Sequence, residues 1–513
     1  MVQGLQQAGL LLWSDGLSAF QGKVHLTASS KDAGPASCFI MFKGTKADSH
    51  DYGADALARG CRVFLGDNES AMEKMRADYP GEATLFFVKN ARASWACLEA
   101  LANGNPQNRM KLAAVTGTNG KTSTVWLMRG LLDQTNYAMV SLGTLGMYFK
   151  NQYVPTSHTS PDPDYLYPAL AHALAAGADC CGMEVSSHSL AQEKIWPLHF
   201  DFAAFTSFSR DHLDFHGTED NYFAAKAKLF TKQLSNDARV ALHHSVAGRI
   251  LSSGFKVSPD SWVYGLDFSP QPWAEWNQMS ATILKESSKG TEIELTLRPR
   301  VGEPVLLQGT IPVFGSVFVE NFMAACLGFG KISGSWPDPK TWSGLKPVPG
   351  RMELVPPIAG GPFVFVDYAH TPDAISQVSV FARKIADSRK SKLWCVFGCG
   401  GDRDQGKRAL MAQASAVNSD RVIVTSDNPR SEDPDAIIDQ IMGGFSENYR
   451  NSHVERISDR AAAILHAVGH AGKDDVVLIA GKGHEAFQEI AGRKTPFDDR
   501  MVAADALATR KKL

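Results

Sequence analysis

The most distinctive chemistry in this sequence is a loop suited to hold phosphate. Residues 113–128 read AAVTGTNGKTSTVWLM: an apolar run precedes two glycines and an amphipathic run that opens with Lys121 and Thr122. This order predicts a strand, a loop and a helix whose N-terminus faces the loop. Loop N–H groups close around phosphate oxygens, a lysine neutralises the outer phosphates, and a neighbouring hydroxyl binds Mg²⁺. The expected nucleotide contacts are Gly117, Thr118, Asn119, Gly120, Lys121, Thr122 and Ser123.

The loop departs from the strict phosphate-binding pattern at one position, because Val115 stands where a glycine is expected five residues before Gly120. An ordinary helix start is therefore the alternative. The strand-like run before the loop and the helical run after it favour nucleotide binding.

Carboxylate, imidazole and amine groups follow in the same region. The segment MEVSSHSL ends a strand-like run at Glu184, SRDHLDFH contains His212 and His216, and YFAAKAKLF places Lys226 on a helix face of small residues. Oxygen and imidazole donors beside a phosphate loop suit Mg²⁺, which takes few protein ligands. Taken singly, each histidine could be structural and Lys226 could be a surface lysine.

The length and composition of the chain limit the number of domains and the class of protein that can contain these groups. A chain of 513 residues predicts about three domains. A net charge of −2 does not indicate the excess of positive charge that binds nucleic acid or an anionic membrane. The eight cysteines show no CxxC pair and fit buried thiols in a reducing compartment. Neither a signal peptide nor an apolar run long enough for a membrane span is evident, so a cytoplasmic location is expected.

Hydrophobic patterning predicts an α/β chain of three domains. Residues 1–106 alternate short apolar runs with helical patterns, which indicates a small N-terminal α/β domain or a plain structural cap. Residues 107–348 form the central domain, with mostly parallel strands at 112–116, 180–185 and 202–206 and an antiparallel flank between 237 and 310. Residues 349–513 alternate strand and helix as in a doubly wound sheet. Four strand-like runs of that last domain end in polar clusters, which predicts a ligand crevice beyond their carboxyl ends.

These segments together resemble the Mur ligase family, whose members are ATP-dependent enzymes that join amino acids to a UDP-linked muramoyl peptide. The matching motifs follow in family order between residues 116 and 485: TGTNGKT, MEVSSH, the DHLD box, YFAAK, PGRME, VDYAHTPD, GCGGDRD, DNPR and GKGHE. The resemblance implies an N-terminal UDP-substrate domain, a central P-loop ATPase-like domain and a C-terminal Rossmann-like domain for the amino acid. DNPR at 427–430 looks like the form that accepts meso-diaminopimelate rather than lysine.

The resemblance also implies roles for individual residues. Mg²⁺ would be bound by Thr122, Glu184, His212 and a carbamylated Lys226, and these last three with Lys121 would be catalytic. Further ATP contacts would be Asn321, Arg351, Asp367 and His370. The UDP-substrate would contact Ser30, Thr45, Lys46, Ala47, Thr159, Ser160, Ser186, Gln192 and Lys194. The amino-acid pocket would contain Arg403, Asp427, Asn428, Pro429, Arg430, Gly481 and Glu485.

Several positions depart from the family pattern. The uridine motif Asp-Ser-Arg is replaced by Ser29, Ser30 and Lys31, and the Asn-Ala-Asp-Asp motif near the adenine by Ala241, Leu242, His243 and His244. Phe318 and Ser207 stand where asparagines are usual, and Lys194 where arginine is usual.

The expected activity is the addition of meso-diaminopimelate to UDP-N-acetylmuramoyl-L-alanyl-D-glutamate through an acyl phosphate, in peptidoglycan synthesis. ATP and Mg²⁺ are the expected co-substrate and cofactor, and the chain is expected to be a monomer acting on small molecules. One alternative is a lysine-adding or folyl-polyglutamate-type ligase, against which DNPR and the MEVSSH and DHLD pair argue. Another is a degenerate homologue that binds nucleotide and serves as a scaffold or regulator.

Overall fold

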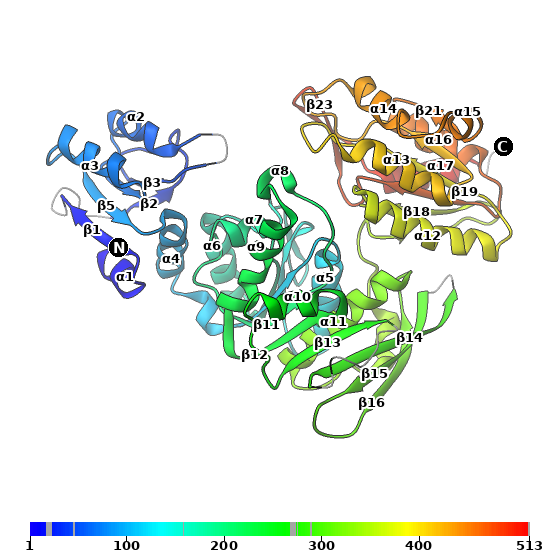
Figure 1. Ribbon diagram of the computed structural model, residues 1–513, viewed down its shortest axis with the longest axis horizontal. Helices are drawn as coiled ribbons and strands as arrows, with labels where there is room; N and C mark the ends of the chain where they lie inside the picture. The colour runs from blue at the N-terminus through cyan, green and yellow to red at the C-terminus, as the bar shows by residue number, and fades with distance from the viewer. Residues whose placement is uncertain are drawn as a thin grey trace.

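The structure is a computed structural model, and it describes residues 1–16, 23–44, 47–156, 158–266, 273, 275–287 and 290–510. Within these residues the strands build three large sheets, which follow one another along the chain (Figure 1). The predicted α/β architecture of three parts is confirmed. The predicted boundaries after residues 106 and 348 stay predictions, and both fall between sheets.

The N-terminal sheet pairs its strands in the order β1 (Leu11–Asp15), β5 (Thr84–Val88), β4 (Val63–Gly66), β3 (Ser37–Met41), β2 (His25–Thr27). All neighbours are parallel except β1 and β5. The helices of this part are α1 (Val2–Gln7), α2 (Gly53–Ala58), α3 (Glu69–Asp78) and α4 (Ala91–Ala102), with the 3-10 turns η1 (Ser49–Tyr52) and η2 (Pro106–Arg109). Asn90 Nδ2 donates to Glu193 Oε2 at 2.9 Å and links this part to the next.

The central sheet has the phosphate-loop strand near its middle. Its order is β16 (Val305–Ile311), β15 (Gly290–Arg298), β14 (Asn277–Ser287), β13 (Ser261–Leu266), β12 (Leu234–His243), β11 (Phe200–Phe205), β6 (Lys111–Thr116), β10 (Cys180–Glu184), β7 (Met139–Gly143), β8 (Gly146–Phe149), β9 (Gln152–Val154). The strands from β14 to β7 are parallel. Antiparallel pairs occur at both edges, at β14–β16 as the sequence indicates and also at β7–β9, which the sequence did not predict.

Alternate residues of β6 face opposite layers of helices, which explains its continuous apolar run. Ala113 and Val115 pack with α5 (Lys121–Leu132) and α11 (Ser316–Ser333). Leu112 and Ala114 pack with α6 (Pro163–Ala175) and α9 (Glu219–Lys232) on the other face. The shorter elements are α7 (Ser187–Ala191), α8 (Leu213–His216), α10 (His244–Ser252) and η3 (Pro339–Gly344).

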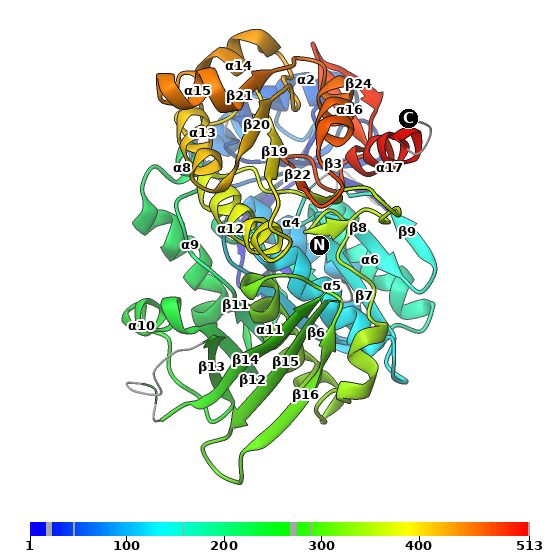
Figure 2. The same cartoon turned by 90° about the vertical axis from the view of Figure 1, so that its right-hand side faces the viewer.

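The C-terminal sheet is doubly wound, as predicted. Its order is β17 (Glu353–Leu354), β18 (Phe363–Asp367), β22 (Val476–Ala480), β19 (Leu393–Phe397), β20 (Arg421–Val424), β21 (Val454–Arg456), parallel except for β17. One face packs on α12 (Pro372–Ser388), α13 (Lys407–Asn418) and α14 (Pro434–Met442), the other on α16 (Arg460–His470) and α17 (Asp499–Arg510). The remaining elements are α15 (Glu447–His453), β23 (Phe487–Ile490) and β24 (Arg493–Pro496). Figure 2 shows α12 between this sheet and the central part.

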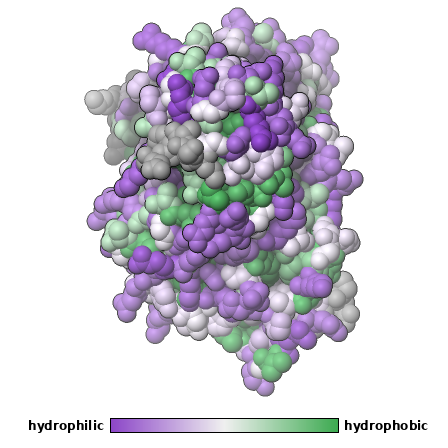
Figure 3. Space-filling model, turned by 90° about the vertical axis from the view of Figure 1, so that its left-hand side faces the viewer, coloured by the Kyte–Doolittle hydropathy of each residue, from purple (hydrophilic) through white to green (hydrophobic). Residues whose placement is uncertain are grey.

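All eight cysteines are buried and none forms a disulfide, as the sequence indicated. In the part of the chain that the structure describes, no helix combines the length and apolar character needed to cross a membrane. The face of the N-terminal part in Figure 3 is mostly hydrophilic, with hydrophobic side chains gathered in smaller patches near its middle.

Candidate active site

The carboxyl ends of three neighbouring strands bring the central site together. Glu184 at the end of β10 lies in register with Val115 of β6, and Phe205 of β11 lies in register with Thr116. The phosphate loop, Glu184 and the residues after β11 therefore meet at one sheet edge. Gly117 has φ +148°, and a Cβ there would lie 2.1 Å from Thr206 Oγ1, so this close approach requires glycine.

The Lys121 side chain folds back over the loop. Its Nζ donates to the carbonyl oxygens of Gly117 and Thr118, both at 2.8 Å. Desolvation lowers the pKa of Lys121 from its ordinary value, and the carboxylate of Glu184 opposes that shift. Within the described part of the chain, Nζ hydrogen-bonds to backbone carbonyls of the loop, so a phosphate oxygen can replace them without breaking an ion pair.

Oxygen atoms converge beside the loop. Thr122 Oγ1 donates to Glu184 Oε2 at 2.9 Å, and Glu184 is only 2% exposed. The N–H of Thr144 donates to Glu184 Oε1 at 2.7 Å, and Thr144 Oγ1 lies 3.2 Å from Oε2. Arg351 Nη2 approaches Thr122 Oγ1 at 3.2 Å from the C-terminal part. An oxygen-rich donor set of this kind matches what Mg²⁺ prefers.

Lys226 is buried rather than at the surface, which corrects the interpretation from its helix alone. The residue is 1% exposed, and its Nζ donates to Gly117 O at 2.8 Å and lies 4.6 Å from the Tyr222 ring centroid. Burial, followed by the charge of Lys121, holds the pKa of Lys226 well below its ordinary value. Burial of this kind favours the neutral, nucleophilic form of an amine.

His212 lies at the N-terminus of α8 with φ +53°. Its Nε2 is 3.4 Å from Asp211 Oδ2, and its ring centroid is 4.9 Å from that of His188. His216 has a structural contact instead, because its buried Nε2 lies 2.9 Å from Ser187 Oγ. Burial is the largest cause that lowers the pKa of His216 to about 4.

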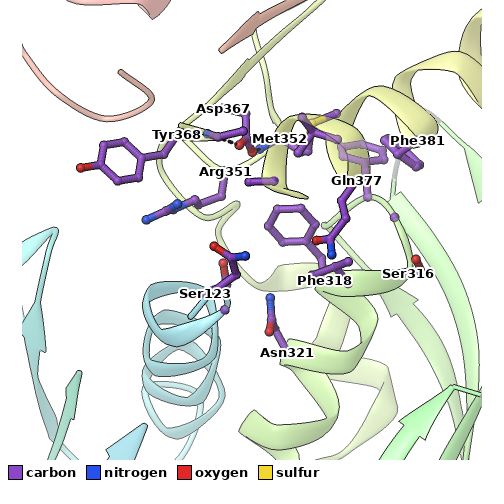
Figure 4. Close-up of a pocket in the computed structure, with 18 of the residues that line it drawn as sticks. Ser123, Ser316, Phe318, Asn321, Arg351, Met352, Asp367, Tyr368, Gln377 and Phe381 are labelled. Carbon is purple, nitrogen blue, oxygen red and sulfur yellow. Dashed lines mark hydrogen bonds between the residues drawn. The ribbon is translucent and has the colours of Figure 1, made fainter. Parts of the chain in front are cut away.

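A cleft lies between the central and C-terminal parts, and eight predicted ATP contacts line it. In Figure 4, Asn321 and Phe318 point into it from α11 and Ser123 lies at the start of α5, while Arg351 and Tyr368 lie on the opposite side with side chains that extend away from Phe318. Phe318, which replaces the usual asparagine, gives the cleft an apolar wall together with Phe381. The carboxylate of Asp367 accepts from the N–H groups of Met352 at 2.6 Å and Ala369 at 2.7 Å. The predicted contacts that line the cleft are Asn119, Gly120, Thr122, Ser123, Asn321, Arg351, Asp367 and His370.

Among the residues predicted to hold the muramoyl peptide, Thr159 and Ser160 lie near Glu184. Thr159 Oγ1 is 3.1 Å from Thr144 Oγ1, and Ser160 Oγ donates to Glu184 O at 2.8 Å. Ser186 caps α7 through its side chain, and Gln192 ends that helix. Lys194 Nζ forms an ion pair with Asp162 Oδ1 at 2.6 Å.

The predicted uridine contacts are separate from this centre. Ser30 and Ala47 line one pocket beside the N-terminal sheet, together with Ser29 and Lys31 of the altered motif. Thr45 and Lys46 lie outside the described residues.

The residues predicted for the amino-acid pocket include two groups that follow the ends of β20 and β22. Asn428 Nδ2 donates to Glu485 Oε2 at 2.7 Å, and Lys482 Nζ reaches Asn428 Oδ1 at 3.0 Å and Glu485 Oε2 at 3.1 Å. Gly481 approaches the carboxylate of Asp427 so closely that a Cβ would lie 2.4 Å from Oδ2. DNPR and GKGHE, more than fifty residues apart in the chain, therefore form one polar cluster.

Arg430 is half-buried and held in place by its backbone and side chain. Its N–H donates to Glu489 O at 3.0 Å, and its Nη1 donates to Gly401 O at 2.7 Å. The neighbouring Ser431 Oγ donates to Asp402 Oδ1 at 2.6 Å. These bonds join DNPR to the loop that carries Arg403, whose exposed side chain contacts the Asp402 carbonyl at 3.2 Å. Pro429 lies between the two cluster residues Asn428 and Arg430.

Sequence reasoning missed Thr144 and Lys482. Thr144 directly follows β7, so the rule that ligand groups follow the carboxyl ends of parallel strands could have found it. Lys482 lies inside GKGHE and is fully buried, a position that its sequence neighbours do not reveal.

Comparisons with known proteins agree with this arrangement. Residues 115–328 match the Mur ligase middle domain, and residues 350–483 match the Mur ligase, glutamate ligase domain. The chain is 38% identical over 486 residues to UDP-N-acetylmuramoyl-L-alanyl-D-glutamate--2,6-diaminopimelate ligase of Xanthomonas campestris pv. campestris, covering 94% of each chain. The protein of that name from Pseudomonas putida is 36% identical over 488 residues, covering 94% of this chain and 95% of the relative. A solved structure of a ligase with this name is 29% identical with a TM-score of 0.63, covering 96% of both chains. The chain belongs to the Mur ligase family.

Proposed function

We propose that the chain is an ATP-dependent amide ligase that adds meso-diaminopimelate to UDP-N-acetylmuramoyl-L-alanyl-D-glutamate during synthesis of peptidoglycan precursors. The observation that carries the proposal is the 3.2 Å contact between Arg351 Nη2 and Thr122 Oγ1. It places the loop of the C-terminal part over the phosphate loop, so the two reacting substrates can meet between them. Relatives named for the addition of 2,6-diaminopimelate support the choice of substrates.

The reaction has two steps. The free carboxylate of the D-glutamyl residue attacks the γ-phosphorus of ATP, which gives an acyl phosphate and ADP. The amine of meso-diaminopimelate then attacks the acyl carbon, loses a proton, and the tetrahedral intermediate expels phosphate. Lys121 neutralises charge on the transferred phosphoryl group, and the surrounding cleft aligns the groups and excludes water.

The residues beside the loop fit Mg²⁺. Thr122 and Glu184 present oxygen atoms to one place, and Glu184 has no cationic side chain among its hydrogen-bond partners in the described residues. We infer that Thr122, Glu184, His212 and Lys226 as a carbamate hold the ion. Once bound, the ion would supply charge neutralisation for phosphoryl transfer. Lys226 attains its anionic form when its neutral amine adds CO₂ and releases a proton.

The C-terminal cluster would select the amino acid. Arg430 offers a planar guanidinium, which grips a carboxylate through two parallel hydrogen bonds. Asn428, Glu485 and Arg403 would hold the remaining ammonium and carboxylate groups of a zwitterionic substrate.

The test is to incubate the full-length chain with ATP, Mg²⁺, the UDP-linked dipeptide and one amino acid at a time. Phosphate release and product mass are both measured. The proposal expects release that requires both acceptor and amino acid, and a product heavier by one diaminopimelate residue. Nucleotide binding without any amino-acid-dependent release would show a degenerate homologue instead.

A further inference from the structure

Two histidines and a glutamate form a cluster on the central part, where β12, α10 and α11 meet. His243 ends β12, His244 begins α10, and Glu320 lies in the first turns of α11. One donor atom from each of these side chains lies within 4.8 Å of the donors from the other two. All three residues are half-buried, and the side chains of His243 and Glu320 are 12% and 22% exposed.

The two imidazoles pack against Gly265 of β13. A Cβ built on Gly265 would lie 3.3 Å from His244 Nε2 and 3.4 Å from His243 Nε2. It would also lie 2.5 Å from His244 Cδ2, so this position cannot carry a side chain while the rings stay in place. Both Nε2 atoms therefore lie close to the same glycine near the end of β13.

Neighbouring groups hold the ligand atoms in position. His243 Nδ1 lies 2.7 Å from Ser245 Oγ, which leaves the opposite ring nitrogen, Nε2, facing Glu320 Oε1 at 3.0 Å. The N–H of Leu266 donates to Glu320 Oε1 at 3.2 Å. In metal sites, partners of this kind orient the side chains that bind the metal, because they fix the imidazole ring and the carboxylate before the ion binds.

We infer that His243, His244 and Glu320 form a site for a divalent first-row transition ion such as Zn²⁺, separate from the Mg²⁺ expected at the phosphate loop. Two imidazoles and one carboxylate are a donor set that suits Zn²⁺ and its neighbours, and Mg²⁺ prefers oxygen alone. The ion replaces the hydrogen bond between His243 Nε2 and Glu320 Oε1 and leaves further coordination positions to water. Occupancy ties β12, α10 and α11 together beside Asn321, which lines the cleft.

The test measures Zn²⁺ binding to the full-length chain by equilibrium dialysis and metal analysis. Wild type should bind one more ion per chain than Glu320→Gln or His244→Gln, and loss of a ligand should weaken this site by about 100-fold or more. The matched control removes another close histidine pair, His466 and His470 on α16, whose ring centroids are 4.1 Å apart. The double variant His466→Ala with His470→Ala should keep the ion, and Zn²⁺ should still raise its Tm.

The inference is overturned if Glu320→Gln and His244→Gln bind as many ions as wild type with unchanged affinity, or if only the α16 double variant loses one. Crystals of wild type soaked in Zn²⁺ decide the question if the variants fail to fold. An anomalous peak about 2.0–2.2 Å from all three side chains supports the site. Peaks that lie only elsewhere reject it. Neither result bears on ligase activity, so this inference and the proposed function can fail independently.

Discussion

The Nζ atom of Lys226 lies 2.8 Å from the carbonyl oxygen of Gly117, the first glycine of the phosphate loop. This amine reaches the loop from α9, more than one hundred residues further along the chain. Lys121 Nζ donates to the same carbonyl oxygen at 2.8 Å. Two lysines therefore share one acceptor, and a neutral or anionic Lys226 would relieve the repulsion between the two amines.

Lys226 should carry a CO₂ adduct in the folded protein. Its neutral, buried amine can add CO₂, and the carbamate would remove the repulsion from Lys121. Incubation with ¹³C-bicarbonate should give one carbamate resonance that Lys226→Ala lacks. Lys226→Ala should be inactive and partly rescued by a small carboxylate, whereas Lys232→Ala, at an exposed position of the same helix, should stay active. An unmodified Lys226 amine in Mg²⁺-bound crystals grown with bicarbonate would contradict this expectation.

Lys121→Ala should abolish turnover without unfolding the protein. Among the described residues its hydrogen bonds go to two loop carbonyls, and Glu184 keeps its hydrogen bonds from Thr122 and Thr144 when Lys121 is removed. Loss of a group that stabilises transition-state charge costs about 10²–10³-fold in kcat. Phosphate release measures the effect, and thermal unfolding checks the fold. Near-normal release by this variant would exclude the proposed phosphate contact.

Much of this centre could be predicted from the sequence, because a strand, a glycine loop and a helix are local features. The burial of Lys226 could not be predicted, since it depends on how α9 packs against a loop from another part of the chain. Phe318 replaces an expected asparagine, and only the structure shows that the ring lines the cleft with Phe381. The antiparallel pairs β7–β9 have short and partly exposed strands, so their apolar pattern is weak.

His216 should make the central part sensitive to acid. Its pKa is about 4 in the folded chain and about 6.5 in the unfolded chain. Between these pH values the unfolded state binds more protons than the folded state. The free energy of unfolding therefore falls as the pH drops below about 6.5. The side chain is nearly buried, and the difference is worth about 2 kcal/mol at about pH 5. The drop in Tm between about pH 7.5 and about pH 5 should be smaller in His216→Gln. The exposed control His25→Gln should behave as wild type, and an equal drop in all three proteins would refute the assignment.

Arg460 and Asp499 should stabilise the C-terminal pocket. Both side chains are fully buried. Arg460 Nε donates to Asp499 Oδ1 at 2.8 Å, and Arg460 Nη2 donates to Asp499 Oδ2 at 2.7 Å. Arg460 also donates to the carbonyl oxygens of Ser426 and Ala480, near the ends of two strands. Asp499→Ala leaves a buried charge without its partner and should cost about 3–5 kcal/mol of unfolding free energy. The exposed pair of Arg456 and Asp435 is the control, since Asp435→Ala should cost about 0–1 kcal/mol. Equal losses in urea unfolding would contradict the role of burial.

Substitution of Arg430 tests which amino acid the enzyme accepts. The DNPR motif could be predicted as a strand end from the sequence, but the left-handed backbone of Arg430, with φ +53°, and its bond to Gly401 depend on a distant loop. Meso-diaminopimelate carries a second carboxylate that lysine lacks. A site that hydrogen-bonds a polar group rejects analogues without it by about 10⁴-fold or more, because the site group is then left unpaired.

The most direct measurement is kcat/KM for meso-diaminopimelate and for L-lysine on wild type, Arg430→Ala and Arg430→Lys. Wild type should prefer meso-diaminopimelate by about 10⁴-fold or more. Both variants should lose most of that preference because their kcat/KM for meso-diaminopimelate falls. Arg430→Lys should not rescue it, since a lysine ammonium cannot form the two parallel hydrogen bonds of a planar guanidinium. If wild type uses L-lysine as well as meso-diaminopimelate, the proposed substrate is wrong.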